Sequence, residues 1–411
     1  MSEWKTYKLC EVANLSTGFP FDGHKYAKEG QRVVRGDNVT IGELRWDTDK
    51  DKRWNEPFAR AEEFSLQEGD IVIGMDGSRV GRNRAQIKAD DLPLLLAQRV
   101  ACVRHNEKSL QKFLYYQIFS KNFENYIKSV HTGTSIPHVS LKQIGDFSFQ
   151  VPDLSTQQRI AGILGSLDDK IELNRRINAN LEAQAQALFR SWFVDNETQN
   201  NNPGFFNDII QTTLSGDWGQ ETPKGNYISE VYCIRGADIP DIKCGDKGKL
   251  PTRYILEKNL KNKKLSENDL VVEISGGSPT QSTGRICLIT RALLDRLGKD
   301  VICTNFCRAL KPIPDYSFFI YLYWQYLYNN NTMFSYENGT TGIKNLNITD
   351  FINKEPITIP GKKKILEFNK VLQPIFDMIY KNGRESEYLS ALRDTLLPKL
   401  MAGEIKIKKS Y

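Results

Sequence analysis

The sequence predicts a mixed α/β (α+β) fold in which two duplicated globular domains are separated by two long antiparallel helices, with pseudo-twofold symmetry. The first observation is an internal repeat, because an apolar ladder that follows Pro152 returns after Pro360 at a constant offset of 208 residues. The second is the spacing within this ladder, which alternates steps of four and three residues as in a coiled-coil seam. The third is a polar stretch at 196–208, NETQNNNPGFFND, which has the composition of a linker.

The repeat also extends upstream of the helices. LQEGDIVIGMDGS (66–78) resembles LSENDLVVEISGGS (265–278), and VVRGDNV (33–39) resembles CIRGADI (233–239). Two similar globular domains are therefore expected, each followed by one long helix. The predicted segments are a first domain at 1–152, a central helix at 153–195, a second domain at 196–360, and a distal helix with a tail at 361–411.

Both helical segments carry polar residues on the apolar seam. Asn174 and Asn178 lie on the first seam, and Asn382 and Ser386 occupy the matching places in the second. A polar seam residue weakens packing but fixes the register of a helix pair. About forty residues at 1.5 Å each give a helix of roughly 60 Å, which is too long for the interior of either domain.

Pro398 lies in the second helical segment, in LRDTLLPKLMAGEI (392–405). Because proline cannot donate a backbone hydrogen bond to the residue four positions earlier, a bend or break is expected there. We expect this joint to direct residues 404–407 towards residues 1–15.

Composition sets wide limits on function. Lys and Arg number 56 against 50 Asp and Glu, and the net charge of +6 is compatible with a polyanionic partner. No run of 18 apolar residues and no signal-peptide core are present, so a cytoplasmic protein without a membrane span is expected. The seven cysteines include no C-x-x-C pair, which favours buried thiols over a metal site.

Three stretches resemble the specificity (S) subunit of Type I restriction-modification systems. They are GDWGQETP (216–223), which resembles the entry to a target recognition domain, LDDKIELNRRINANLEAQAQALFRSWF (167–193) and LPKLMAGEI (397–405), which resemble the family's two helices. The order of the parts also matches over essentially the whole chain. The resemblance implies two target recognition domains, each reading one half of a bipartite asymmetric sequence in double-stranded DNA, with helices that set the half-site spacing.

The same resemblance implies that this subunit has no catalytic site. Two methyltransferase subunits would dock on the helices, and two restriction (nuclease-translocase) subunits would join for cleavage. Adenine methylation with S-adenosylmethionine, and ATP hydrolysis with Mg, would belong to those partners, so no cofactor or metal is expected on this chain. The residues predicted to contact partners are Leu181, Leu188, Trp192, Leu389 and Leu396. Burial of Trp192 against the adjoining domain is an equal alternative.

The residues themselves agree with a non-catalytic role. No NPPY-like tetrapeptide and no P-loop pattern occurs, and Glu404-Ile405-Lys406 lacks an accompanying carboxylate cluster. The alternatives are a self-contained nuclease or methyltransferase with fused recognition domains, and a repeat-built scaffold without a nucleic-acid role. The first of these needs a catalytic domain, for which the repeats and helices leave no room.

DNA contacts are expected in loops that differ between the copies while their flanks match. GMDGSRVGRNRAQI (74–87) carries three arginines, suited to guanine edges or phosphates, whereas SGGSPTQSTGRI (275–286) carries glutamine and hydroxyl side chains. Two further loops, HTGTSIPH (131–138) and NGTTGIKN (338–345), offer small residues beside glycine. Ordinary solvated turns are the alternative for all four.

The predicted DNA-binding residues come from both copies. In the first they are Arg35, Arg79, Arg82, Arg84, Thr134, Ser135 and His138. In the second they are Arg235, Ser278, Gln281, Ser282, Thr283, Arg285, Thr340, Thr341 and Lys344. Arg35 and Arg235 follow short apolar strands, where pairing with a nearby carboxylate such as Asp37 is the alternative to a DNA contact.

Overall fold

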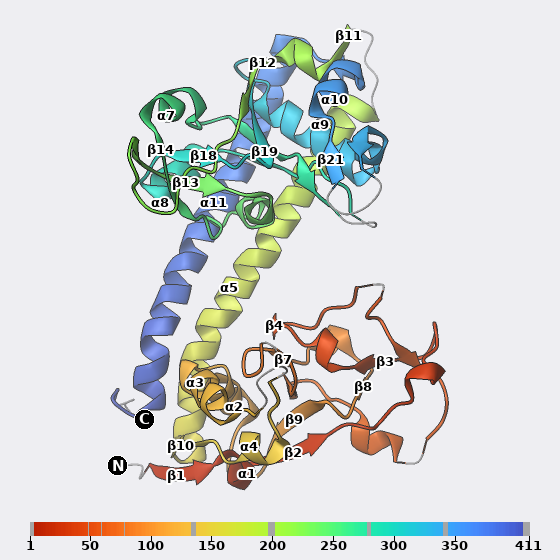
Figure 1. Cartoon of the computed structure of the whole chain (residues 1–411), viewed down its shortest axis with the longest axis vertical. Helices are drawn as coiled ribbons and strands as arrows, with labels where there is room; N and C mark the ends of the chain where they lie inside the picture. Colours follow the sequence, from red (N-terminus) through yellow and green to blue (C-terminus); the bar gives the residue numbers. More distant parts are fainter. Residues whose placement is uncertain are drawn as a thin grey trace. The chain divides into compact units, whose positions relative to one another are not determined.

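The chain forms two compact units in the computed structural model. Unit 1 comprises Met1–Asp169 and Ala391–Tyr411, and unit 2 comprises Lys170–Ser390. Two long helices, α5 (Leu154–Phe189) and α11 (Lys362–Met401), each contribute to both units (Figure 1). The structure describes residues 4–47, 49–58, 60–77, 79–132, 137–195, 202–277, 281–339 and 344–405.

Unit 1 is built on a five-stranded sheet with the strand order β2-β9-β6-β7-β4. The strands of this sheet are β2 (Ala13–Thr17), β9 (Val100–His105), β6 (Ile71–Gly74), β7 (Arg84–Gln86) and β4 (Ile41–Gly42). The central strand β6, with the sequence IVIG, is buried along its whole length, which explains why it is apolar at every position rather than alternating.

Two smaller sheets and four helices complete unit 1. The three-stranded sheet β5-β3-β8 contains β5 (Arg53–Trp54), β3 (Gln31–Val34) and β8 (Leu94–Leu96), and β1 (Lys5–Lys8) pairs with β10 (Ser148–Val151). The helices are α1 (Leu9–Val12), α2 (Gln111–Ile118), α3 (Lys121–Val130) and α4 (Leu141–Gly145).

Unit 2 repeats this topology. Its four-stranded sheet, β12-β19-β15-β17, has the same neighbours in the same directions as β2-β9-β6-β7 of unit 1. The bounds are β12 (Ile210–Ser215), β19 (Cys307–Pro312), β15 (Leu270–Glu273) and β17 (Ile286–Leu288). The predicted duplication is therefore confirmed at the level of strand order.

The remaining elements of unit 2 also have counterparts. The sheet β14-β13-β18 contains β14 (Thr252–Leu256), β13 (Tyr227–Ile234) and β18 (Val301–Cys303), and its β13–β18 pair is parallel, as is β3–β8. The other strands are β11 (Asn202–Phe205), β22 (Pro356–Ile359), β16 (Ser275–Gly276), β20 (Glu337–Asn338) and β21 (Lys344–Leu346). The helices are α6 (Ile239–Lys243), α7 (Glu257–Lys263), α8 (Arg291–Leu297), α9 (Ser317–Asn329) and α10 (Ile348–Lys354).

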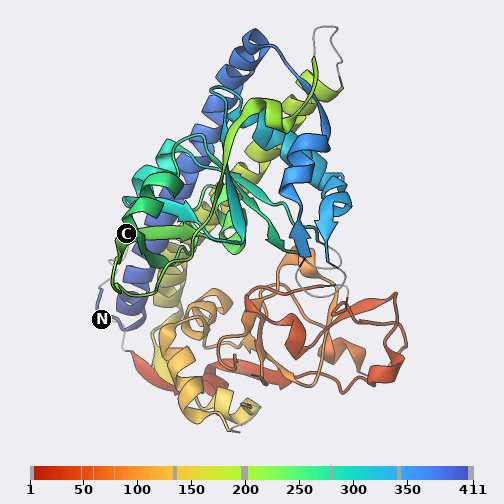
Figure 2. The ribbon, with the colours of Figure 1, turned by 45° about the horizontal axis from the view of Figure 1, so that its top comes forward.

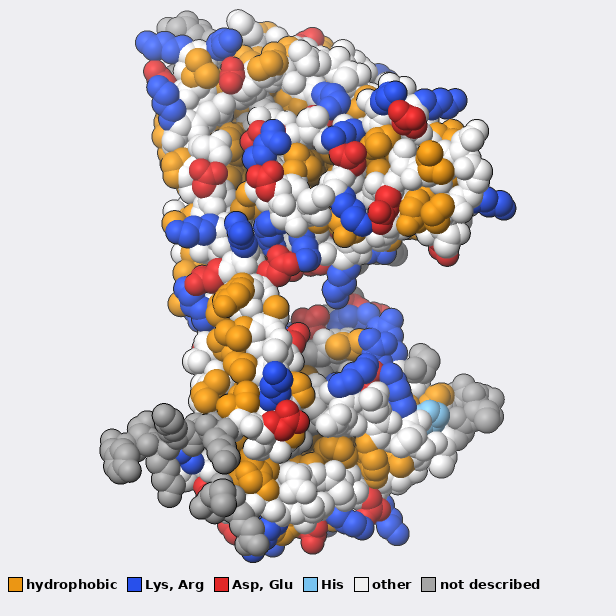
Figure 3. Space-filling model, turned by 90° about the vertical axis from the view of Figure 1, so that its left-hand side faces the viewer, with side chains coloured by type: hydrophobic (Ala, Val, Ile, Leu, Met, Phe, Trp, Pro, Cys, Tyr) orange, Lys and Arg blue, Asp and Glu red, His pale blue; other side chains and the backbone are white. Residues whose placement is uncertain are grey.

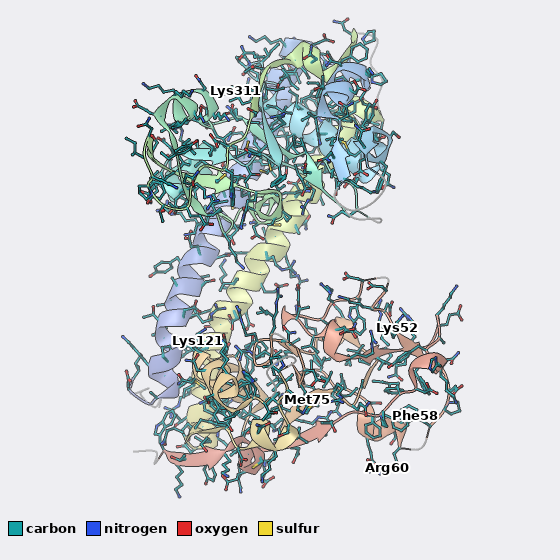
Figure 4. The ribbon with its side chains drawn as sticks, in the orientation of Figure 1. Lys52, Phe58, Arg60, Met75, Lys121 and Lys311 are labelled. Carbon is teal, nitrogen blue, oxygen red and sulfur yellow. The ribbon has the colours of Figure 1, made fainter. Side chains whose placement is uncertain are left out.

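A buried ion pair occupies the same place in both units. The Asp70 carboxylate accepts two hydrogen bonds from the Arg104 guanidinium, at 2.6 and 2.7 Å. In unit 2 the Lys311 ammonium, labelled in Figure 4, lies 2.9 Å from the Asp269 carboxylate. Burial raises the pKa of Asp269, and the bond from Lys311 opposes that rise. Each aspartate precedes the buried central strand, so an adjacent cation is needed to offset its desolvation.

Buried asparagines align the two long helices within unit 2. The Asn174 side chain donates to the Asn382 carbonyl at 3.4 Å and to the Ser386 hydroxyl at 3.2 Å. The Asn382 side chain donates to Asn178 Oδ1 at 2.9 Å, and Asn178 donates to the Ile379 carbonyl at 2.9 Å. Higher numbers on α5 thus meet lower numbers on α11, which makes the pair antiparallel (Figure 2).

The prediction of a break in the helix at Pro398 is wrong. Helix α11 runs without interruption through Pro374 and Pro398 to Met401. Both prolines are exposed, so water can reach the carbonyl groups that lose their helical donors. The helix ends before Gly403, whose positive φ of 71° is typical of a residue that terminates a helix. Gly403 also lies close to the Trp4 ring, since a Cβ at that glycine would be 2.9 Å from it. The segment after the helix therefore lies beside the first strand, as expected, although residues 406 and 407 fall outside the described ranges.

Aromatic stripes fill the cores. Tyr116 of α2 and Trp324 of α9 are both buried, and the Trp324 indole N–H donates to the Gly284 carbonyl at 2.8 Å. Within the described ranges, no helix is both long enough and apolar enough to span a membrane.

Candidate nucleic-acid interface

An open hollow of about 550 Å³ lies on unit 1, beside the ends of β3 and β6. Its lining includes the aromatic side chains Phe19, Phe21 and Tyr26, the carboxylates Asp37 and Asp76, and the cations Arg35, Arg45, Lys50, Arg79 and Arg99. Five cations against two carboxylates give this surface the charge that suits a phosphate-bearing ligand.

Arg35 enters the hollow from the end of β3. Its backbone N–H donates to Asn38 Oδ1 at 3.0 Å, which caps a short 3-10 turn and fixes where the side chain starts. The guanidinium lies 5.7 Å from the centre of the Tyr26 ring, and its Nη2 is 3.4 Å from the Asp37 carboxylate. Arg35 Nε is buried and has no hydrogen-bond partner within the described residues. The alternative pairing with Asp37 is therefore present, while Arg35 also lines the hollow, and its contact with DNA stays a prediction.

His138 and Asp76 form a polar pair at the rim of the same hollow. His138 Nδ1 makes a short hydrogen bond with Asp76 Oδ1, and Arg99 Nη1 lies 3.5 Å from the other carboxylate oxygen. The Arg99 side chain remains 64% exposed. The arrangement leaves an exposed cation next to a fixed carboxylate, which orients the guanidinium towards solvent.

The three predicted arginines of the 79–84 loop separate in the structure. Arg79 is exposed and lines the hollow, whereas Arg82 is half exposed, with its Nε 3.6 Å from Glu124. The Arg84 side chain is only 8% exposed and donates to the Gly81 carbonyl at 3.0 Å. Burial lowers the pKa of Arg84, with Glu124 acting in the opposite direction. The assignment of Arg84 as a DNA contact is therefore corrected: it braces the loop from within.

Two predicted arginines of unit 2 are held by carboxylates. Arg285 donates to both oxygens of the buried Glu273 carboxylate, at 2.5 and 2.7 Å, and this bonding raises the pKa of Arg285. Arg235 donates to both oxygens of Asp238, at 2.9 and 3.0 Å, and to the Lys249 carbonyl at 2.8 Å. These bonds use two of the five N–H groups of Arg285 and three of those of Arg235, so carboxylates fix both side chains, while their contact with DNA stays a prediction.

Glu337 ties the other predicted residues of unit 2 together. Thr283 donates its backbone N–H and its hydroxyl to Glu337, and the Lys344 ammonium lies 2.9 Å from the same carboxylate. Ser282 and Thr283 are buried, whereas Gln281 is exposed. The structure thus gives Thr283 and Lys344 an internal partner and buries Ser282, while their contact with DNA stays a prediction. The remaining predicted residues, Thr134, Ser135, Ser278, Thr340 and Thr341, lie outside the described residues.

Comparison with known proteins gives one consistent result. Residues 1–183 match the family model of the Type I restriction modification DNA specificity domain. The Type I restriction enzyme HindI specificity subunit of Haemophilus influenzae is 25% identical over 98% of this chain and 100% of its own length. The MjaIX specificity subunit of Methanocaldococcus jannaschii is 26% identical over 77% of this chain and 74% of its own. The first part of this chain is thus similar to the Type I restriction modification DNA specificity domain, and most of its length is similar to specificity subunits.

The fold is also similar to that of a solved structure. The crystal structure of a Type-I restriction-modification system S subunit from M. genitalium covers 99% of this chain and 97% of its own, with a TM-score of 0.54 at 15% identity. The relatives are named as specificity subunits of restriction enzymes, and the matched family model is named as a DNA specificity domain. Among the residues that the structure describes, no group of three or more His, Cys, Asp and Glu is arranged to hold a metal ion.

The residues that the sequence predicts to contact partners mostly pack against the cores. Leu181, Leu188 and Trp192 pack against the core of unit 2, and Leu396 packs against the core of unit 1, while Leu389 is half-buried. The apolar seam that made the first four conspicuous in the sequence thus packs against the cores, as the alternative for Trp192 has it, and their contact with a partner stays a prediction.

Other apolar side chains occupy the outer surface of the helices. Within unit 2, exposed positions include Leu173 and Ile177 on α5 and Met378 and Tyr388 on α11. Figure 3 shows apolar side chains gathered on the surface of the long helices. Sequence reasoning missed these residues because they lie off the seam, and it missed Arg45, Lys50 and Arg99 because they are distant in sequence from the predicted loops.

Proposed function

We propose that this chain is a Type I specificity subunit that reads a split, asymmetric target in double-stranded DNA, with one half-site recognised by each unit. The observation that carries the proposal is the combination of a shared strand topology with unlike surface chemistry. In unit 1 the hollow gathers five cations, whereas at the corresponding loop of unit 2 the arginine is bound internally by Glu273. Like scaffolds with unlike surfaces are what two different half-sites require.

We further propose that the long helices set the half-site spacing. The hydrogen bonds among Asn174, Asn178 and Asn382 support this role, because they define a single register for the helix pair within unit 2. Removing seven residues from each helix, outside the asparagine cluster, should shorten the preferred spacer and leave both half-site sequences unchanged. An unchanged spacer would contradict the role of the helices.

Methyltransferase subunits would dock on the outer face of the helices. The exposed apolar side chains Leu173, Ile177, Met378 and Tyr388 support this assignment, since a stable subunit interface buries an apolar centre. Ile177→Glu should reduce co-purification with the methyltransferase subunits. Ile228→Glu, which changes another exposed apolar residue of unit 2, should not. Equal effects of the two substitutions would refute a specific surface.

The chemistry of the system would lie on partner subunits. We propose two methyltransferase subunits that methylate adenine with S-adenosylmethionine, and two restriction subunits that use ATP and Mg. The chain alone, incubated with duplex DNA and labelled S-adenosylmethionine, should transfer no methyl group. Transfer by the chain alone would instead favour a self-contained methyltransferase.

The deciding experiment is methylation profiling of DNA exposed to the complex of this chain with its methyltransferase subunits. A bipartite motif with two unlike halves is expected, and binding should weaken steeply with salt. Replacing residues 1–152 by the corresponding domain of another family member should change one half of the motif only. A change in both halves, or the absence of a bipartite motif, would contradict the proposal.

A further inference from the structure

Backbone hydrogen bonds identify an equivalent exposed position in the two units. In unit 1 the Met75 N–H donates to the Arg99 carbonyl at 3.2 Å, and in unit 2 the Ile274 N–H donates to the Phe306 carbonyl at 2.9 Å. Arg99 directly precedes β9, which pairs with the buried strand β6, and Phe306 directly precedes β19, which pairs with the buried strand β15. The registers also match, because Val100 opposes Gly74 and Cys307 opposes Glu273. Arg99 and Phe306 are therefore counterparts.

The turn that carries this position is held in the same way in both copies. Glycine packs directly on it: a Cβ at Gly18 would lie 1.9 Å from the Leu96 carbonyl oxygen, and a Cβ at Gly216 would lie 1.8 Å from the Thr304 carbonyl oxygen. Such close backbone approach fixes the turn without using the side chain at position 99 or 306. That side chain is therefore free to differ.

The residues beside positions 99 and 306 occupy equivalent places in the two units but differ in residue type. The Val139 N–H donates to the Met75 carbonyl and the Leu346 N–H donates to the Ile274 carbonyl, both at 2.9 Å. His138 and Asn345, which precede the two donors, are therefore counterparts, and so are Asp76 and Ser275, which follow the two acceptors. His138 bonds to Asp76 in unit 1, and Ser275 bonds to Asn345 in unit 2. Each unit presents a polar pair beside one protruding side chain.

The protruding side chains are strongly exposed and chemically opposite. The Arg99 side chain is 64% exposed, and it lies within a hollow lined by cations. Phe306 is 60% exposed, although it sits on the scaffold position that an arginine occupies in unit 1. Neither side chain belongs to a core cluster, so neither is explained by packing.

We propose that positions 99 and 306 are the equivalent base-reading positions of the two units. This inference rests on the proposed function, in which each unit reads one half-site. The Arg99 guanidinium, oriented by Asp76, has the donor fork that matches O6 and N7 of guanine in the major groove. Phe306 offers an apolar surface to the methyl group of thymine. Asp76 is a positioning residue, since it acts through Arg99.

The test uses the full chain in complex with its methyltransferase subunits and a library of duplex DNA randomised across the target. Arg99→Ala should lower the preference for guanine at one base pair by roughly 5- to 150-fold, while the other half-site stays unchanged. Phe306→Ala should lower the preference for thymine by about fourfold in that other half-site, the value expected for one buried methyl group. Asp76→Asn should weaken the guanine preference without abolishing binding.

Matched controls come from equally exposed residues elsewhere. Arg60, labelled in Figure 4, is an exposed arginine of unit 1 that does not line the hollow, and Ile228 is an exposed apolar residue of unit 2. Arg60→Ala and Ile228→Ala should leave every base preference unchanged. Phe306→Arg should introduce a guanine preference in the second half-site, which a merely destabilised protein would not show.

Different failures have different meanings. If wild-type protein selects a split motif but Arg99→Ala and Phe306→Ala select the same motif, the base-reading assignment is overturned and the proposed function stands. A uniform loss of affinity for all sequences on changing Arg99 also overturns it, because that result identifies a phosphate contact. If wild-type protein selects no split motif, the proposed function fails and this assignment fails with it.

Discussion

Gly383→Ala should destabilise unit 2 even though it places a better helix former inside a long helix. Alanine in a helix interior is normally favoured over glycine by about 0.8–1.0 kcal/mol. At position 383 of α11, however, the added Cβ would lie 1.9 Å from the carbonyl oxygen of Gly245. Because Cβ atoms essentially never approach other heavy atoms closer than 3.0 Å, the loop and the helix must separate by about 1.1 Å, the difference between the two distances.

This separation would disturb buried hydrogen bonds at the helix pair. The Asn178 side chain donates to the Cys244 carbonyl at 3.0 Å and to the Ile379 carbonyl at 2.9 Å, and both groups lie beside the clash. Overpacking typically costs about 1–3 kcal/mol, and a buried polar group that loses its partner costs about 1–3 kcal/mol. After the gain in helix propensity is subtracted from the sum of these two costs, a net loss of about 1–5 kcal/mol is expected.

Thermal unfolding measures this loss, and a second glycine provides the control. For a unit of this size, the expected fall in the melting temperature of unit 2 is about 2–20 °C. Gly162 lies in α5, and a Cβ added there would have no heavy atom within 4 Å, so Gly162→Ala should stabilise the protein by up to about 1 kcal/mol. Hydrogen exchange at residues 244–245 should rise in Gly383→Ala only. Stabilisation by both substitutions would refute the close approach of loop and helix.

Three further predictions concern ionisable groups. Burial raises the pKa of Glu387, but its ion pairs with Lys247 and Arg296 lower that pKa on balance. The stabilising contribution of the Glu387 carboxylate is therefore complete above about pH 4.5 and is lost as the pH falls further. Glu387→Gln should therefore lower the melting temperature at pH 7 by more than it does at pH 3, and equal losses would contradict the ion pair. Arg84→Ala should destabilise unit 1 by about 1–3 kcal/mol in thermal unfolding and leave the salt dependence of DNA binding unchanged; a reduced salt slope would restore Arg84 as a phosphate contact. Burial raises the pKa of Cys303 well above its usual value, so iodoacetamide at pH 8 should label the exposed Cys10 but not Cys303 in the native protein, as read by mass spectrometry.

The helices and the duplication were predictable from the sequence because both leave a regular pattern. The apolar ladder has a period that only a helix satisfies, and Asn174 and Asn178 interrupt it at the positions where they are found hydrogen-bonded to α11. The break at Pro398 was predicted wrongly, because the sequence does not show that the carbonyl group left without a donor faces solvent.

The surface was less predictable, since exposure depends on residues far away in the chain. Arg84 looks like its neighbours Arg79 and Arg82, but Glu124 of α3 and the aromatic rings of Phe119 and Phe123 enclose it. Likewise, Glu273 lies twelve residues before Arg285 and is recognisable as its partner only once β15 and β17 are paired. Loop composition located the right region of the chain but not the side chains that are free to act.

The two copies also show which changes the scaffold permits. At the buried aspartates the cation is retained and only its type changes, from Arg104 to Lys311, because an uncompensated carboxylate beside a buried strand would cost several kcal/mol. At positions 99 and 306 the change from arginine to phenylalanine alters charge, shape and polarity, but both side chains are exposed and substitutions at such sites usually cost within about 0.5 kcal/mol. Recognition could therefore diverge between the copies without a loss of stability, since the residues that hold the turn are Gly18 and Gly216 rather than the side chains that it presents.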